Sequence, residues 1–157
     1  MSPLDCTQAC APVSLAQYAL AAAIAPEACP VPLFLIKIPA GFPSPAADYV
    51  EEGLDLNTYL VKHKAASFYF TVEGDSMTGA GILAGDRVLV DRSIEPKHGH
   101  IVVAVISNEF TLKRLYRRRG VVELRPENPA YKVIVVSDDD DLQIWGVVAG
   151  VVRKFAV

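Results

Sequence analysis

The chain contains 157 residues, with a formal net charge of -3 at pH 7 and a hydrophobic content of 52%. This length fits one domain with its own core plus an arm. Prolines and charges interrupt the apolar stretches, so no run reaches the roughly 20 residues that span a bilayer. The acidic balance disfavours direct nucleic-acid binding. Because Asp5 also replaces the positive charge of a secretory signal, we expect a cytoplasmic protein with no membrane anchor.

Residues 1–40 are expected to form a mobile N-terminal arm. They are rich in proline, and the alanine-rich run from Ala19 to Ala25 has room for one short helix. That is too little for a helix-turn-helix domain with a core of its own. The sequence therefore predicts one domain preceded by an arm, without a DNA-reading domain.

All cysteines fall in this arm. Their number is odd, which in a reducing compartment disfavours a disulfide framework. Zinc would need a fourth ligand, and the histidines lie far away without ligand spacing. We expect free thiols, no metal and no cofactor. The residues concerned are Cys6, Cys10, Cys29, His63, His98 and His100.

A candidate scissile bond, Ala40-Gly41, ends the arm. Small residues on both sides let the bond enter a narrow catalytic cleft, and Pro39 and Pro43 hold the segment extended. A proline-rich linker is the alternative interpretation, which composition alone favours. If the bond is a substrate, processing removes residues 1–40 and leaves Gly41 as the new N-terminus.

Residues 41–66 are expected to connect the arm to the domain. Ser44-Pro45 is a favourable helix start, with the hydroxyl as N-cap and proline at the first helical position. Apolar positions then follow at helical spacing, although Gly53 weakens the pattern. We expect a short helix or an irregular turn that includes Val50, Leu54, Asn57 and Val61.

From Ser67 onward, short strands rich in valine and isoleucine alternate with turns. Their even spacing predicts a compact, mostly antiparallel β domain over residues 67–157. The charge runs at 117–119 and 138–141 are expected to be solvated turns. The expected strands cover residues 68–72, 87–91, 101–106, 110–116, 121–125, 133–136 and 142–152.

The first of these strands leads into Gly74-Asp75-Ser76-Met77. A glycine-bearing turn can present the Ser76 hydroxyl outward, and the backbone N–H groups of Ser76 and Met77 can then line an oxyanion site. Taken alone, Gly-Asp-Ser is more often an ordinary turn. A nearby base is needed to favour catalysis.

Lys113 is the candidate base. A serine hydroxyl needs a partner that takes its proton, and a desolvated neutral lysine can do so in place of histidine. Lys113 lies in an apolar run between Phe110 and Leu115, and burial lowers a lysine pKa. The pair predicts peptide hydrolysis with Ser76 as nucleophile and Lys113 as general base.

The C-terminal strand also carries more apolar surface than one small core readily hides. We therefore expect a homodimer. The apolar residues concerned are Ile144, Trp145, Val147, Val148, Val151 and Val152.

Gly74-Asp75-Ser76-Met77, Phe110-Thr111-Leu112-Lys113 and Ala40-Gly41 together resemble the self-cleaving LexA/UmuD family of serine-lysine peptidases. The segment from Phe42 to Glu51 is similar to the UmuD branch. The resemblance implies an accessory subunit of an error-prone lesion-bypass polymerase in the SOS response. It also implies stimulation by a RecA filament on single-stranded DNA, and a trimmed homodimer that joins a UmuC-like catalytic subunit.

Other functions stay open at this point. The chain would be a dimerisation and polymerase-docking module if its peptidase were vestigial. The missing DNA-binding domain opposes a repressor, although a LexA-type repressor fragment that lacks this domain is a further alternative. A signal peptidase shares the Ser-Lys dyad but needs a membrane anchor.

Overall fold

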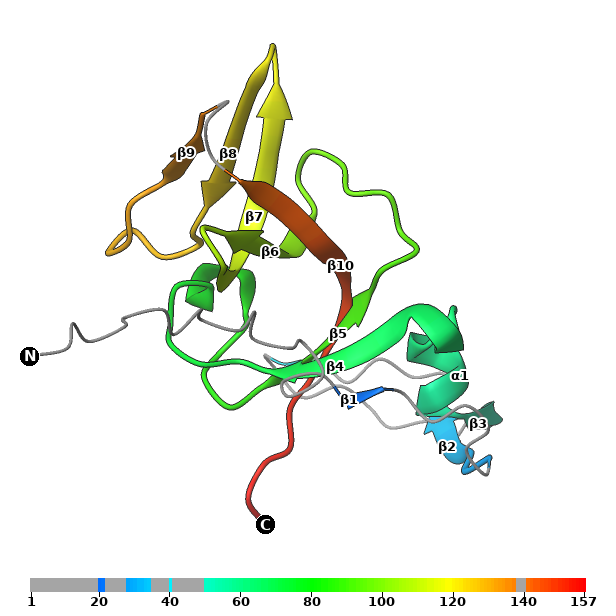
Figure 1. The fold of residues 1–157 in the computed structure, drawn as a ribbon. Coiled ribbons are helices and arrows are strands. Elements are labelled where there is room, and N and C mark those ends of the chain that lie inside the picture. The colour runs from blue at the N-terminus through cyan, green and yellow to red at the C-terminus, as the bar shows by residue number, and fades with distance from the viewer. Residues whose placement is uncertain (1–19, 22–27, 35–39, 41–49, 138–140) are drawn as a thin grey trace, which may run out of the picture.

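The computed structural model describes residues 20–21, 28–34, 40, 50–137 and 141–157. An antiparallel sheet of eight strands dominates these ranges (Figure 1). Its strands, in spatial order, are β1 (Leu20–Ala21), β4 (Ser67–Thr71), β5 (Arg87–Asp91), β10 (Leu142–Val152), β6 (Ile101–Ile106), β7 (Glu109–Arg118), β8 (Val121–Arg125) and β9 (Ile134–Val136).

Smaller elements accompany this sheet. They are a two-stranded sheet of β2 (Val31–Phe34) and β3 (Val50–Leu54), the helix α1 (Leu56–Leu60), and the 3-10 turns η2 (Lys64–Ala66) and η3 (Thr78–Ala80). No helix in the described ranges has the length and apolar character needed to cross a membrane.

The predicted antiparallel β fold is confirmed, and β5, β6, β8 and β10 have the predicted bounds. β7 is longer than predicted at both ends. Ser107 and Asn108, before it, and Arg119 and Gly120, after it, have positive φ angles. Such tight two-residue turns match the twist of paired strands, so the strands continue up to the turns.

The helix expected in the alanine-rich run differs from the structure, and the short helix expected within residues 41–66 is present but begins later. Leu20 and Ala21, in the alanine-rich run, are extended and pair with Tyr69 and Phe68 of β4. The edge of a sheet offers unpaired backbone groups, which favour an added strand. The remaining residues of the run lie outside the described residues.

The segment from Val50 to Leu54 forms a strand and not the start of a helix. The helix begins at Leu56, where the Asp55 side chain caps it by accepting from the Thr58 N–H at 2.9 Å. The expected start at Ser44-Pro45 lies outside the described residues.

Hydrophobic clusters on the two faces of the sheet stabilise the fold. Val102 and Ala104 of β6 belong to one cluster, and Val103, between them, belongs to the other. Successive strand residues point to opposite faces, which explains why β6 is apolar along its whole length. Met77 packs in the cluster with Val103 and Trp145, so the segment after β4 is anchored on the core.

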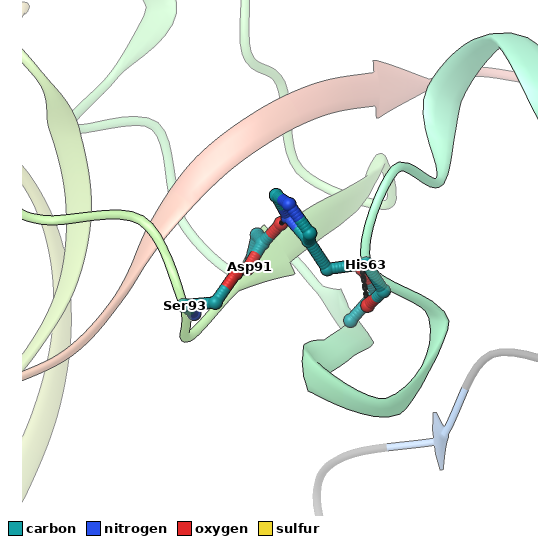
Figure 2. Close-up of polar contacts among 4 residues, drawn as sticks. His63, Asp91 and Ser93 are labelled. Carbon is teal, nitrogen blue, oxygen red and sulfur yellow. Dashed lines mark hydrogen bonds and ion pairs between the residues drawn. The ribbon is translucent and has the colours of Figure 1, made fainter.

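A buried carboxylate, Asp91, joins the segment after α1 to the end of β5 (Figure 2). It contacts His63 Nδ1 at 2.6 Å and accepts from the Ser93 N–H at 2.8 Å and the Ser93 hydroxyl at 2.6 Å. Burial raises the pKa of Asp91, but these bonds outweigh it and the pKa lies below 3.8. Because the Ser93 hydroxyl donates to Asp91 rather than to His63, this group lacks the serine-histidine bond of a catalytic triad.

A second buried carboxylate, Asp86, fixes the C-terminal segment. Arg153 donates to its two oxygens at 2.6 and 2.5 Å, and the Leu83 N–H donates at 2.8 Å. The Arg153 hydrogen bond, followed by that from Leu83, lowers the pKa of Asp86 from 3.8 to about 2. Ionised Asp86 therefore stabilises the fold above pH 3.8, and this contribution is lost as the pH falls through about 2.

Asp86→Asn is expected to remove that pH dependence. The variant should be less stable than the parent chain at neutral pH, and the difference should shrink as the pH falls toward 2. Urea unfolding measured across this range tests it, with the exposed Asp141→Asn as matched control. A constant difference at every pH would show that Asp86 does not act through its charge.

Candidate active site

The turn after β4 positions Ser76. Gly74 adopts φ 79°, which glycine reaches without strain. Two residues after it, Ser76 is half-buried, and Met77 beside it is 2% exposed in the core. The buried Met77 side chain fixes the backbone here, and the Ser76 hydroxyl faces β7.

Lys113 reaches this hydroxyl from β7. Its Nζ lies 3.0 Å from Ser76 Oγ, 3.0 Å from Thr111 Oγ1 and 3.0 Å from the Leu112 carbonyl oxygen. Thr111 and Lys113 are two positions apart on a strand and so share a face. The structure thus brings together Ser76 and Lys113, which the sequence singled out, and adds Thr111.

These contacts match the needs of a neutral amine. A neutral lysine has two N–H bonds and one lone pair. The Leu112 carbonyl can only accept, and the Thr111 hydroxyl can accept a second hydrogen bond. Once both N–H bonds are used in this way, the lone pair is left for the Ser76 hydroxyl proton. The arrangement can therefore remove a proton from Ser76.

Burial favours that neutral form. Lys113 is 8% exposed, and desolvation lowers its pKa from 10.5. No carboxylate among the described residues forms an ion pair with it. A carboxylate partner would stabilise the ammonium and oppose the shift.

The predicted oxyanion donors, the backbone N–H groups of Ser76 and Met77, sit at the same turn. None of the described residues accepts a hydrogen bond from either group. The carbonyl oxygens of both residues are used instead, by the N–H groups of Glu127, Ala80 and Ile82. Both N–H groups thus have no acceptor within the described part of the chain.

A small cavity of about 120 Å³ opens beside the dyad, and its lining includes Ser76, Met77 and Lys113. A larger groove of about 840 Å³ lies next to it. The two share lining residues from the segment directly after β4 and from β7. These are Val72, Glu73, Phe110, Thr111 and Leu112.

The predicted scissile bond is only half described. Ala40 is exposed in a bend and does not line the cavity, and Gly41 lies outside the described residues. Among the described residues, no group of three or more His, Cys, Asp or Glu is placed to hold a metal ion. Cys29 is exposed with a free thiol, while Cys6 and Cys10 lie outside the described residues.

Sequence reasoning gave no role to two parts of this site. Thr111 belongs to the Phe110–Lys113 motif, and its place two residues before Lys113 on a strand was the available signal. The turn at Glu127-Asn128-Pro129 was expected only as a connection. In the structure it contacts the Ser76 turn directly, since the Glu127 N–H donates to the Ser76 carbonyl at 2.8 Å. Nothing local in the sequence reveals that long-range bond.

The amino-acid sequence was compared with protein families and with known proteins. Residues 32–149 match the Peptidase S24-like family. The chain belongs to that family. Protein SamA of Salmonella typhimurium strain LT2 is 46% identical over 135 residues, which cover 83% of this chain and 94% of SamA. Protein ImpA of Escherichia coli is 43% identical over 124 residues, or 78% of this chain and 83% of ImpA.

The LexA repressor of Syntrophotalea carbinolica is 49% identical over 88 residues, which cover 56% of this chain and 44% of the repressor. These similarities confirm that this S24-like chain is a UmuD-like member of the LexA/UmuD group. The family associates it with autocatalytic serine peptidases, the SOS response to DNA damage and mutagenesis. The matched range includes Ser76, Lys113 and Ala40-Gly41.

Proposed function

We propose that the chain is a self-cleaving accessory subunit of a lesion-bypass DNA polymerase, which cuts its own Ala40-Gly41 bond with Ser76 and Lys113. The observation that carries the proposal is the 3.0 Å contact between Ser76 Oγ and the buried Lys113 Nζ. We further propose that the protein acts in the cytoplasm during the SOS response, and membership of the UmuD-like branch supports the link to that response.

The chemistry follows from the dyad. Neutral Lys113 removes the Ser76 proton as the hydroxyl oxygen attacks the Ala40 carbonyl carbon. The backbone N–H groups of Ser76 and Met77 stabilise the negative oxygen that forms. Protonated Lys113 then gives its proton to the Gly41 nitrogen as that bond breaks. Water, activated by Lys113, hydrolyses the ester between Ser76 and Ala40 and frees the serine.

The small cavity supports the choice of bond. A volume of about 120 Å³ at the dyad suits the small side chains of Ala40 and Gly41. Because Ala40 is exposed and does not line this cavity, cleavage requires the segment around it to move into the cleft. A stimulus that favours this movement fits the proposed role of a RecA filament on single-stranded DNA.

The proposed partners come from the UmuD-like branch. After loss of residues 1–40, a homodimer of the domain over residues 67–157, with its connecting segment 41–66, would join a UmuC-like subunit. The apolar surface for dimerisation is smaller than the sequence suggested, because Trp145 and Val147 are 5% and 4% exposed in the chain's own core. Val151 and Val152 stay exposed, and sedimentation equilibrium of the full chain tests the dimer.

The direct test is the intact mass of purified full-length chain held at neutral and alkaline pH. We expect two products whose masses correspond to a cut between Ala40 and Gly41. Gly41→Trp should block the reaction, since an indole does not fit the narrow site, while the circular dichroism of the β domain stays unchanged. A chain that remains intact at every pH, with and without activated RecA, would instead favour a docking module with a vestigial peptidase.

A further inference from the structure

The loop between β8 and β9 contacts the turn that carries Ser76. We call residues Glu127–Tyr131 the clamp loop and residues Gly74–Ala80 the nucleophile turn. The Glu127 N–H donates to the Ser76 carbonyl at 2.8 Å, and the Glu127 carbonyl accepts from the Gly79 N–H at 2.7 Å. These two bonds attach the nucleophile turn at Ser76 and at Gly79 to one residue, Glu127, which lies far away in the sequence.

Side chains of the clamp loop reinforce this contact at Asp75. Asn128 Nδ2 donates to the Asp75 carbonyl at 3.0 Å, and the Tyr131 hydroxyl donates to the Asp75 carboxylate. The loop is also internally fixed, since the Asn128 amide oxygen accepts from the Ala130 N–H at 3.0 Å. Asp75, immediately before the nucleophile, is thus held at both its backbone and its side chain.

Arg114 connects the clamp loop to the strand that carries the base. It is the neighbour of Lys113 on β7, and its guanidinium pairs with the Glu127 carboxylate and donates to the Gly99 carbonyl at 2.7 Å. Two consecutive residues of β7 therefore act on Ser76, one directly and the other through the clamp loop. Lys113 contacts the Ser76 hydroxyl, and Arg114 holds the loop whose backbone holds the Ser76 carbonyl.

We propose that Asn128 and Tyr131 are positioning residues, which hold the nucleophile turn so that the Ser76 hydroxyl stays within reach of Lys113. This inference rests on the proposed function. The contacts set the distance and direction of Ser76, and small displacements of a nucleophile have large effects on rate. Asp75 and Tyr131 are exposed, so their bond buries little apolar surface and should matter more for geometry than for folding.

The close packing at Gly79 supports a fixed distance between the two segments. A Cβ built at Gly79 would lie 2.3 Å from the Glu127 carbonyl oxygen, nearer than atoms can approach. Gly79→Ala should therefore push the clamp loop away from the nucleophile turn. This substitution disturbs the contact between the two segments from the nucleophile turn, without replacing Asn128 or Tyr131 of the clamp loop.

The test uses the full chain and a double-mutant cycle between Asp75→Ala and Tyr131→Phe. Each single variant should lower the plateau rate of self-cleavage roughly tenfold, the loss expected for one hydrogen bond to a charged group. The double variant should lose no more than the singles, since the residues share one bond. Asn128→Ala should show a similar loss, and Tyr59→Phe, a change at an exposed tyrosine of α1, should cleave like the parent chain.

Two further measurements separate positioning from general stability. The pH at half-maximal rate should stay unchanged in the clamp variants, because Lys113 keeps the burial that lowers its pKa, and the thermal midpoint should fall little. Amide hydrogen exchange at Gly79 and Glu127, whose N–H groups form the bonds between the segments, should be faster in Asn128→Ala and Tyr131→Phe. This readout does not depend on cleavage.

The outcomes distinguish the two proposals. Wild-type rates and exchange in Asn128→Ala and Tyr131→Phe, with no cleavage in Ser76→Ala, would overturn the clamp and leave the proposed function standing. Cleavage in Ser76→Ala would overturn the proposed function. Rate losses that simply follow a lower thermal midpoint would assign the loop to folding and would also overturn the clamp.

Discussion

Self-cleavage is expected to accelerate as the pH rises and to level off at a pH below 10.5, the ordinary lysine pKa. Only the neutral amine can accept the Ser76 proton, so the rate follows the fraction of Lys113 that is deprotonated. Because burial lowers the pKa of Lys113, the deprotonated fraction becomes large at a lower pH than for an exposed lysine. First-order rates from intact masses across neutral and alkaline pH measure the profile, and a flat profile would exclude Lys113 as base.

Lys113→Arg should be inactive over the whole range, since a guanidinium stays protonated and cannot act as base. Lys113→Met should also be inactive, but it should be more stable than the parent chain at neutral pH. Below its folded pKa the buried ammonium destabilises the fold, and this penalty disappears as the pH rises toward 10.5. An inactive, stabilised Lys113→Met variant would show that activity is lost without unfolding.

Ser76→Ala is expected to abolish cleavage completely under every condition. The alanine chain lacks the attacking oxygen, and no other hydroxyl of the described residues except that of Thr111 is within hydrogen-bond distance of Lys113 Nζ. Incubation for many half-lives of the parent chain, followed by intact-mass measurement, detects any residual product. Product at Ala40-Gly41 in this variant would exclude Ser76 as the nucleophile.

Ser76→Cys provides the matched variant. A thiol is intrinsically more nucleophilic than a hydroxyl, and the change alters one atom of the side chain. We expect measurable cleavage that is blocked by a thiol-alkylating reagent, whereas the parent chain should be unaffected by the reagent. Cys6, Cys10 and Cys29 can all be replaced by serine in both chains, so that the reagent reports on position 76.

The strands could be predicted because each has a local signal, a short apolar run bounded by turn residues. The central strand β6 is apolar throughout since both faces of the sheet are covered there. The helix after β3 was placed too early because helical spacing from Val50 to Val61 also fits a strand followed by a short helix. Asp55, whose side chain caps the helix, was the stronger local signal.

The dyad residues could be chosen from sequence because their chemistry is specific: a serine in a glycine turn and a lysine in an apolar run. The residues that hold the Ser76 turn in place could not be identified in this way. The bonds from Asn128 and Tyr131 to Asp75 join residues 53 and 56 positions apart, and no local pattern encodes such a contact. Sequence reasoning singled out the backbone N–H of Met77 and gave no role to its side chain, which is 2% exposed, so only replacements of similar volume should be tolerated.

The position of β10 in the sheet has a consequence for the chain during its synthesis. β10 contacts β5 through one part of its length and β6 through another, so it joins the strands next to Ser76 to those next to Lys113 (Figure 1). Among the described strands it also comes after all the others in the sequence, and synthesis proceeds from the N-terminus. The arm, the candidate bond and Ser76 all leave the ribosome before the strand that completes the sheet. If the proposed self-cleavage requires the complete sheet, we expect no cleavage in a nascent chain that still lacks β10.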